Sequence, residues 1–179
     1  MLEVESKFHS PGNDKVEKAL VKLGAKKISG GPMEDIYFSH PARDFGKTDE
    51  ALRLRKMDGG AELTYKGPRM NIERAKGREE ITIGAENPLA AQMIVERLGF
   101  EEFCIVKKTR SSYLFDKLRV ELDDVEGLGE FVELEVLTES PERGTELLET
   151  IRKELSLEKL EQRTYLELIL EKREAQKGR

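Results

Sequence analysis

Residues 2–8, LEVESKF, are the stretch that decides the fold, because charged and apolar side chains alternate along them. Glu3, Glu5 and Lys7 occupy every second position, and apolar residues take most of the others. Since successive side chains of a β-strand point to opposite faces, this strand has one charged face and one largely apolar face. The apolar face can pack in a hydrophobic core, and the charged face is the feature that a function must explain.

The same alternation recurs in later segments. The charged positions that share one face are Arg53 and Arg55; Glu62 and Lys66; Arg78 and Glu80; Lys108 and Arg110; Arg119, Glu121 and Asp123; and Glu133 and Glu135. Some of these strands carry only bases on that face, and others carry mainly acids. An antiparallel sheet with one wet face explains any single charged strand without a ligand. The segregation of sign across strands favours a surface that grips a charged ligand.

The composition limits the class of protein. The chain has 179 residues, enough for one domain with a sizeable core, and 37% of them are charged, with a net charge of −5. This abundance of charge is typical of proteins from hot environments, and the negative net charge gives no global field for nucleic acid. Cys104 is the one cysteine, so the chain has neither a disulfide framework nor a cysteine-based metal site.

No apolar run reaches the length of a membrane span, and the first residues are typical of a strand rather than of a signal peptide. We therefore expect a cytoplasmic protein without a membrane or nucleic-acid partner.

Hydrophobic periodicity and turn residues predict an α+β domain. The expected strands are residues 2–8, 35–39, 51–57, 61–67, 78–84, 102–110, 112–116, 118–124 and 131–138, and the expected helices are residues 13–24, 87–99, 140–155 and a segment that follows Thr164. Asp58 and Gly59 mark a hairpin, and residues 67–77 are expected to form a polar connection. We expect residues 1–172 to form one domain and residues 173–179 a solvated tail.

A sheet with eight or nine strands can curl into a closed barrel. With its apolar face outside, the amphipathic helices would cover that face, and the interior would collect lysines, arginines and carboxylates. Burying these charges without a ligand is costly. A polyphosphate would occupy the bases, and Mg²⁺ or Mn²⁺ would occupy the carboxylates. The sequence therefore predicts a tunnel for a metal-bound polyphosphate.

An ordered series of motifs carries a family resemblance over most of the chain. Glu3-x-Glu5-x-Lys7, followed by ALRLR, TYKGP, REE, KKTR, LDDVEGLGEFVELEV and TYLEL, resembles the CYTH superfamily, the triphosphate tunnel metalloenzymes. The stretch YFSHPARDFGKTDEALRLR, together with LDDVEGLGEFVELE, is particularly similar to the class IV adenylyl cyclase branch.

The resemblance implies a closed eight-stranded antiparallel β-barrel with helices packed outside. It implies that Glu5 and Glu135 are the main metal ligands, assisted by Glu3, Asp123 and Glu133. The triphosphate ligands it implies are Lys7, Arg53, Arg55, Lys66, Lys108 and Arg110, and Arg78 and Glu80 would hold phosphate or orient a base. Glu5, Glu135, Lys108 and Arg110 would act directly in catalysis. Lys108 is preferred over Lys107 because it shares the parity of Arg110, and Tyr165 fits both the family motif and a core position.

The reaction that the resemblance favours is the conversion of ATP to cyclic AMP and pyrophosphate with Mg²⁺ or Mn²⁺. Hydrolysis of inorganic, thiamine or nucleoside triphosphate is the alternative, because the same tunnel could align water with the terminal phosphate. A third possibility is a nucleotide or polyphosphate-binding protein without catalysis, which the full set of acidic residues makes less favoured. A homodimer is compatible with the resemblance, and the residues themselves give no oligomeric state.

Overall fold

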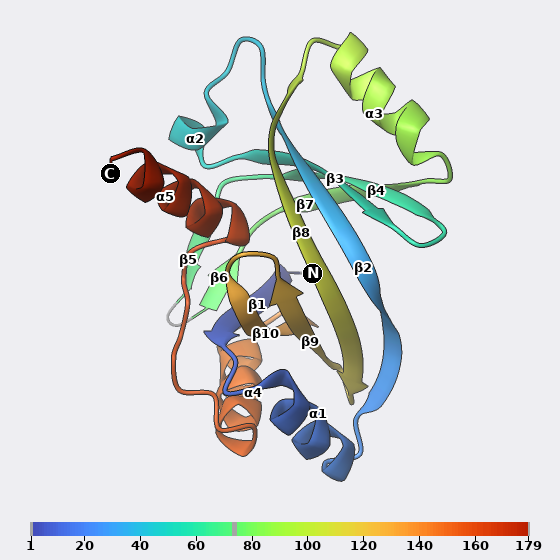
Figure 1. Ribbon diagram of the computed structural model, residues 1–179. Helices are drawn as coiled ribbons and strands as arrows, with labels where there is room; N and C mark the ends of the chain where they lie inside the picture. Colours follow the sequence, from blue (N-terminus) through green and yellow to red (C-terminus); the bar gives the residue numbers. More distant parts are fainter. Residues whose placement is uncertain (1, 73–74, 179) are drawn as a thin grey trace.

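The computed structural model describes residues 2–72 and 75–178, and within these ranges it has ten strands and five helices (Figure 1). The elements in chain order are β1 (Leu2–His9), α1 (Asn13–Lys22), β2 (Lys26–Ser39), α2 (Phe45–Thr48), β3 (Ala51–Met57), β4 (Gly60–Lys66), β5 (Met70–Ile72), β6 (Ala75–Gly77), β7 (Glu80–Ala85), α3 (Pro88–Arg97), β8 (Glu101–Phe115), β9 (Leu118–Val125), β10 (Gly129–Thr138), α4 (Pro141–Glu154) and α5 (Tyr165–Lys177). No helix in these ranges is long and apolar enough to cross a membrane.

The strands form one antiparallel sheet that curls into a half-barrel (Figure 1). Its order is β5-β6-β1-β10-β9-β8-β2-β3-β4-β7, so eight long strands are extended by the short β5 and β6. This confirms the eight-stranded antiparallel sheet with helices outside. The prediction of a closed barrel was too strong, because the described ladder ends at β5 on one side and at β7 on the other.

Two strands are longer than predicted. β2 runs from Lys26 to Ser39, and β8 continues through Ser111 and Ser112, where the sequence analysis divided it in two. No glycine or proline interrupts β8 at that point, and its pairing with β2 is the longest in the sheet. Because β2 and β8 are hydrogen-bonded along most of their length, residues with a weak preference for strands stay extended there.

The outer face of the sheet carries two apolar cores. Helices α1 and α4 cover β1, β9 and β10 around Val4, Phe8 and Leu134. Helix α3 covers β3 and β4 at the opposite end of the molecule, where Leu54 and Val95 are buried (Figure 1). This leaves the charged side chains of the strands on the concave inner face.

Helix α5 covers one end of the inner face instead of the outer face. Its first residue, Tyr165, is buried with Val106 and Phe131 of β8 and β10. The backbone N–H of Glu161 donates to the carbonyl of Lys7 over 2.8 Å, which ties the segment before α5 to β1. The segment before α5 therefore lies beside β1.

Three of the long helices begin with a side-chain cap. The side chains of Asn87, Ser140 and Thr164 accept backbone hydrogen bonds at the starts of α3, α4 and α5, and Thr164 forms a capping box with Glu167. Helix α1 differs, because its N-cap is Gly12 and no side chain caps it. Helix α5 continues to Lys177, and residues 171–178 are exposed.

Candidate active site

A cavity of about 990 Å³ lies against the inner face of the sheet. The charged residues that line it on the sheet side are Glu3, Glu5, Lys7, Asp35, Arg53, Arg55, Glu62, Lys66, Arg78, Glu80, Lys108, Arg110, Arg119, Glu121, Glu133 and Glu135. The cavity is also lined by Arg43, Asp44, Asp49, Glu50, Arg69 and Glu167. Apart from Arg78, which precedes β7, the residues on the sheet side come from β1, β2, β3, β4, β7, β8, β9 and β10, because the strand register brings residues of one parity to the concave side. The cavity is therefore the convergence point of the alternating charges in the sequence.

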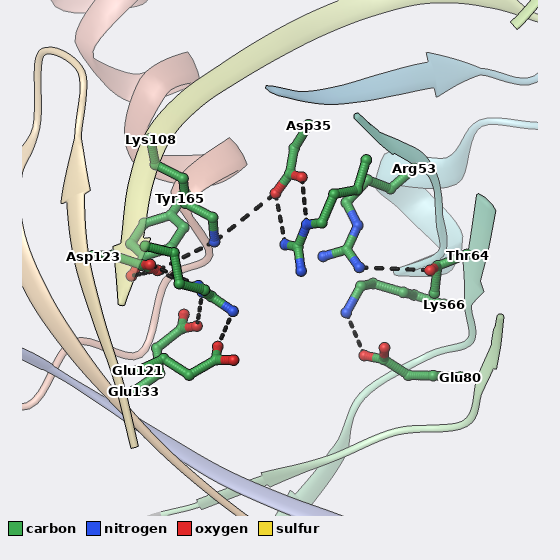
Figure 2. A network of polar contacts seen from close by, with 12 residues as sticks. Asp35, Arg53, Thr64, Lys66, Glu80, Lys108, Glu121, Asp123, Glu133 and Tyr165 are labelled. Carbon is green, nitrogen blue, oxygen red and sulfur yellow. Dashed lines mark hydrogen bonds and ion pairs between the residues drawn. The ribbon is translucent and has the colours of Figure 1, made fainter. Parts of the chain in front are cut away.

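Asp123 is the centre of the first polar network (Figure 2). Its carboxylate accepts from Arg110 Nε over 2.6 Å, from Lys108 Nζ over 3.1 Å and from the Tyr165 hydroxyl over 2.9 Å. Arg110 also donates to Glu133 over 2.7 Å and contacts Glu121. Asp123 itself is fully buried behind these cations and does not line the cavity. It therefore fixes the positions of cations that do reach the cavity.

The charges of this network shift its proton equilibria. Burial alone would raise the pKa of Glu133, but Arg110, Lys108 and Lys7 hold it well below its usual value. Burial lowers the pKa of Lys108 to about 8, and the nearby Arg110 charge acts in the same direction. The carboxylates thus stay ionised at neutral pH and keep the cations fixed.

A second network lies across the cavity on β2, β3, β4 and β7. The guanidinium of Arg55 donates to both carboxylate oxygens of Asp35, over 2.6 and 2.8 Å. Lys108 Nζ lies 3.9 Å from Asp35, so it connects the two networks (Figure 2). Lys66 pairs with Glu80 between β4 and β7. Four cations of the site are therefore held by carboxylates before any ligand arrives, namely Arg55, Lys66, Lys108 and Arg110.

Arg53 is the exception among the buried arginines. Only 9% of it is exposed, and its Nε has no hydrogen-bond partner among the described residues. Its one hydrogen bond goes from Nη2 to the Thr64 hydroxyl over 3.5 Å, which is at the limit of such a bond. A buried guanidinium without a carboxylate is costly unless an anion satisfies it. This side chain therefore has the chemistry of an anion ligand.

Glu3, Glu5 and Glu135 form a group of carboxylates at the same cavity. Burial first, and then the charges of Glu135, Glu80 and Glu5, raise the pKa of Glu3 to about 8. Burial also raises the pKa of Glu135. Carboxylates that repel one another in this way present only oxygen donors, which suit a hard divalent cation. Within the described ranges, no three Asp, Glu, His or Cys side chains already converge on one metal position.

The alternation along each strand correctly predicted which face the site residues lie on. All of them line the cavity except Asp123. Lys108 lines it with a side chain that is 1% exposed, whereas Lys107 is 58% exposed and faces Glu34 outside. The guanidinium of Arg78 donates to the backbone carbonyls of Gly67 and Asp49, so it supports the rim. The roles of the predicted site residues as metal or phosphate ligands stay predictions.

Several residues that line the cavity were not predicted, among them Asp35, Glu50 and Arg69, and the role of Tyr165 was left open. Asp35 was assigned only to a strand, although its parity with Tyr37 and its position opposite Arg55 could have placed it on the inner face. Tyr165 satisfies both alternatives left open for it, because its ring packs 5.1 Å from Phe131 and its hydroxyl donates to Asp123. Lys7 Nζ also lies 4.2 Å above the ring.

A half-barrel whose concave face collects a buried guanidinium, lysines and carboxylates has the architecture of a tunnel fold. The CYTH domain family model matches residues 1–167. The chain therefore belongs to the CYTH family.

Some proteins similar to this chain are named for an enzymatic activity. A candidate adenylate cyclase from Methanocaldococcus jannaschii is 39% identical over 173 residues, covering 94% of this chain and 98% of the relative. The solved structure of the PH1819 protein from Pyrococcus horikoshii is 41% identical, with a TM-score of 0.85 over 95% of this chain and 99% of that one. A Hippeastrum protein, described as a candidate adenylyl cyclase with a dominant triphosphatase activity, shares the fold at 21% identity, with a TM-score of 0.70 over 93% and 94% of the two chains.

These similarities support an enzyme of the CYTH superfamily, whose members are adenylyl cyclases or triphosphatases and are generally metal-dependent. A triphosphate substrate such as ATP is the class of ligand that they imply.

Proposed function

We propose that this protein binds ATP in the cavity together with Mg²⁺ or Mn²⁺ and converts it to cyclic AMP and pyrophosphate. The observation that carries the proposal is the buried, unpartnered Nε of Arg53 in a cavity that also holds a carboxylate group. A polyphosphate supplies the missing acceptor oxygens, and a divalent cation relieves the repulsion among Glu3, Glu5 and Glu135.

The phosphate ligands would be Lys7, Arg53, Arg55, Lys66, Lys108 and Arg110. Arg55 and Arg110 are already fixed by Asp35 and Asp123, so binding does not have to order them. Preorganised donors of this kind stabilise negative charge as it develops on phosphate oxygens, at little reorganisation cost. Asp123 then acts through Arg110 and Lys108 and does not touch the ligand.

The metal ligands would be Glu5 and Glu135, with Glu3 beside them. Glu133 was predicted to assist, but its carboxylate accepts from Arg110, which favours a supporting role. When bound there, Mg²⁺ or Mn²⁺ would supply Lewis-acid polarisation of the phosphate oxygens and lower the pKa of a nearby hydroxyl.

In the cyclase reaction, the ribose 3′-oxygen forms a bond to the α-phosphorus and passes its proton to bulk water, and the bond from the α-phosphorus to the bridging oxygen breaks. Pyrophosphate leaves with the electron pair, next to the cations that stabilise it. The similarity of residues 37–55 to the class IV cyclase branch and the cyclase names of relatives support this reaction.

Hydrolysis at the terminal phosphate is the second candidate function. The Hippeastrum neighbour favours it by analogy, and the positioning of the triphosphate along the cavity would decide between the two reactions. Binding without turnover is a third candidate. The cytoplasmic location and the division at residue 172 stay predictions, as does a homodimer.

Product analysis tests the proposal. The pure protein is incubated with ATP, inorganic triphosphate or thiamine triphosphate, each with Mg²⁺ or Mn²⁺, and the products are separated by chromatography. Cyclic AMP with pyrophosphate supports the proposal, whereas ADP with phosphate supports the triphosphatase. Arg53→Met should weaken binding of triphosphate in calorimetry, and Arg97→Met, on an exposed face of α3 away from the cavity, is the matched control. Equal binding by the two variants would remove Arg53 from the anion site.

A further inference from the structure

Beside the charged residues Arg43, Glu50 and Glu167, the cavity is also lined by apolar and aromatic side chains. Among them are Pro41, Phe45, Phe103, Leu166 and Leu170, from the segment after β2, from β8 and from α5. Apolar side chains offer no hydrogen-bond donors or positive charges to a phosphate chain. Small-molecule sites commonly combine a polar region that fixes charge with an apolar region that holds a ring.

Phe103 has an unusual position in its strand. Along β2 and β8, Tyr37 pairs with Cys104 and Phe38 pairs with Glu102, so Phe103 is the extra residue of a β-bulge. A bulge redirects a side chain, and bulges occur frequently beside active sites. Phe103 is 49% exposed, although its neighbour Cys104 is buried, and it lines the cavity. The strand thus presents a large aromatic ring to the cavity instead of burying it.

The segment after β2 supplies a second group of rings. His40 lies 5.4 Å from Phe45 and 5.0 Å from Phe100, measured between ring centroids. The backbone N–H of Ala42 donates to His40 Nδ1 over 3.0 Å, so the neutral imidazole carries its proton on Nε2. This nitrogen is then available as a donor. His40 and Phe45 both line the cavity, and Phe100 supports them from behind.

We propose that Phe103, with His40 and Phe45, binds the base of a nucleoside triphosphate and makes the protein select nucleotides over inorganic triphosphate. The inference rests on the proposed function, because it needs the phosphates in the charged interior. Aromatic side chains stack on bases without strong dependence on base identity. The cavity volume of about 990 Å³ is at the upper end of the range for small-molecule sites and accommodates more than a bare triphosphate.

Two ligands that differ only in the nucleoside test this assignment. The bismethylene analogues of ATP and of inorganic triphosphate carry carbon in place of both bridging oxygens, so neither bridge can be cleaved. Their affinities are measured by calorimetry with Mg²⁺ for the wild-type protein, for Phe103→Ala and for Leu114→Ala. Leu114 is the matched control, because it lies on the same strand, is 41% exposed and does not line the cavity.

We expect the ATP analogue to bind the wild-type protein more tightly than the triphosphate analogue. Phe103→Ala should weaken the ATP analogue about tenfold and leave the triphosphate analogue unchanged, in line with the loss of one stacking contact. Leu114→Ala should change neither. Equal wild-type affinities for the two analogues, or an unchanged ATP affinity in Phe103→Ala, would overturn the base site alone. Failure of both analogues to bind the wild-type protein would overturn the proposed function and this inference with it.

Discussion

Replacing Asp123 with asparagine removes the charge at the centre of the first network and keeps the shape of the side chain. Lys108 and Arg110 then lose a fully buried carboxylate at 3.1 and 2.6 Å, and the Tyr165 hydroxyl loses the charge of its acceptor. Removing one partner of a buried ion pair costs about 3–5 kcal/mol. Arg110 keeps Glu133 at 2.7 Å, so we expect the lower end of this range, about 3 kcal/mol.

Urea denaturation, followed by circular dichroism, measures this loss as a decrease in the free energy of unfolding. For a chain of this length, about 3 kcal/mol corresponds to a Tm lower by roughly 6–12 °C. Asp124→Asn is the control, since the next side chain of β9 is exposed, and we expect a change within about 0.5 kcal/mol. A loss below about 1 kcal/mol in Asp123→Asn would refute the view that this carboxylate balances the two cations.

The pH dependence gives an independent check on the same prediction. Burial alone would raise the pKa of Asp123, but Arg110 and Lys108 hold it below its usual value of 3.8. The ionised carboxylate therefore stabilises the fold at any pH above that value, and the stabilisation is lost as the pH falls through the lowered native pKa. The difference in stability between wild type and Asp123→Asn should narrow below about pH 4. A constant difference down to pH 2 would contradict the assignment.

Three further predictions concern other parts of the structure. Because the pKa of Glu3 rises from 4.5 to about 8 in the folded state, the metal-free protein should lose stability as the pH rises through this window, and Glu3→Gln should flatten the dependence in urea denaturation. Tyr165→Phe should cost about 1.5–3 kcal/mol by removing the hydrogen bond to Asp123, and an unchanged denaturation midpoint would contradict this. Gly60→Ala should cost about 1–3 kcal/mol, measured by thermal unfolding, because Gly60 has a φ of 153° and a Cβ there would lie 2.9 Å from the Ala85 carbonyl oxygen.

The inner face could be predicted because parity is a local property of each strand. Once Glu3 and Lys7 share a face, the register of an antiparallel sheet brings all residues of that parity to one side. The signal was therefore present in every strand separately, without knowledge of the strand order.

The partners of each charge could not be predicted in the same way. Arg53 and Arg55 are equivalent in the sequence, yet Arg55 is held by Asp35 and Arg53 has a free Nε. That difference depends on how β2 pairs with β3, which is a non-local property. The bulge at Phe103 is also non-local, because only the pairing with β2 shows that one residue is extra. The prediction of a closed barrel was too strong for a similar reason, since the number of strands alone does not determine whether the two edges of the sheet meet.

The pairing of β1 with β10 affects how the chain folds as it is synthesised. β1 leaves the ribosome before β10, and its partners in β10 lie between 122 and 136 residues further along the chain. At about 5–20 residues per second, β1 waits roughly 6–27 seconds for β10. During this time the edge of β1 that later pairs with β10 is open to neighbouring chains, and regularly spaced charges oppose such aggregation. Glu3, Glu5 and Lys7 place such charges on β1 before they line the finished cavity.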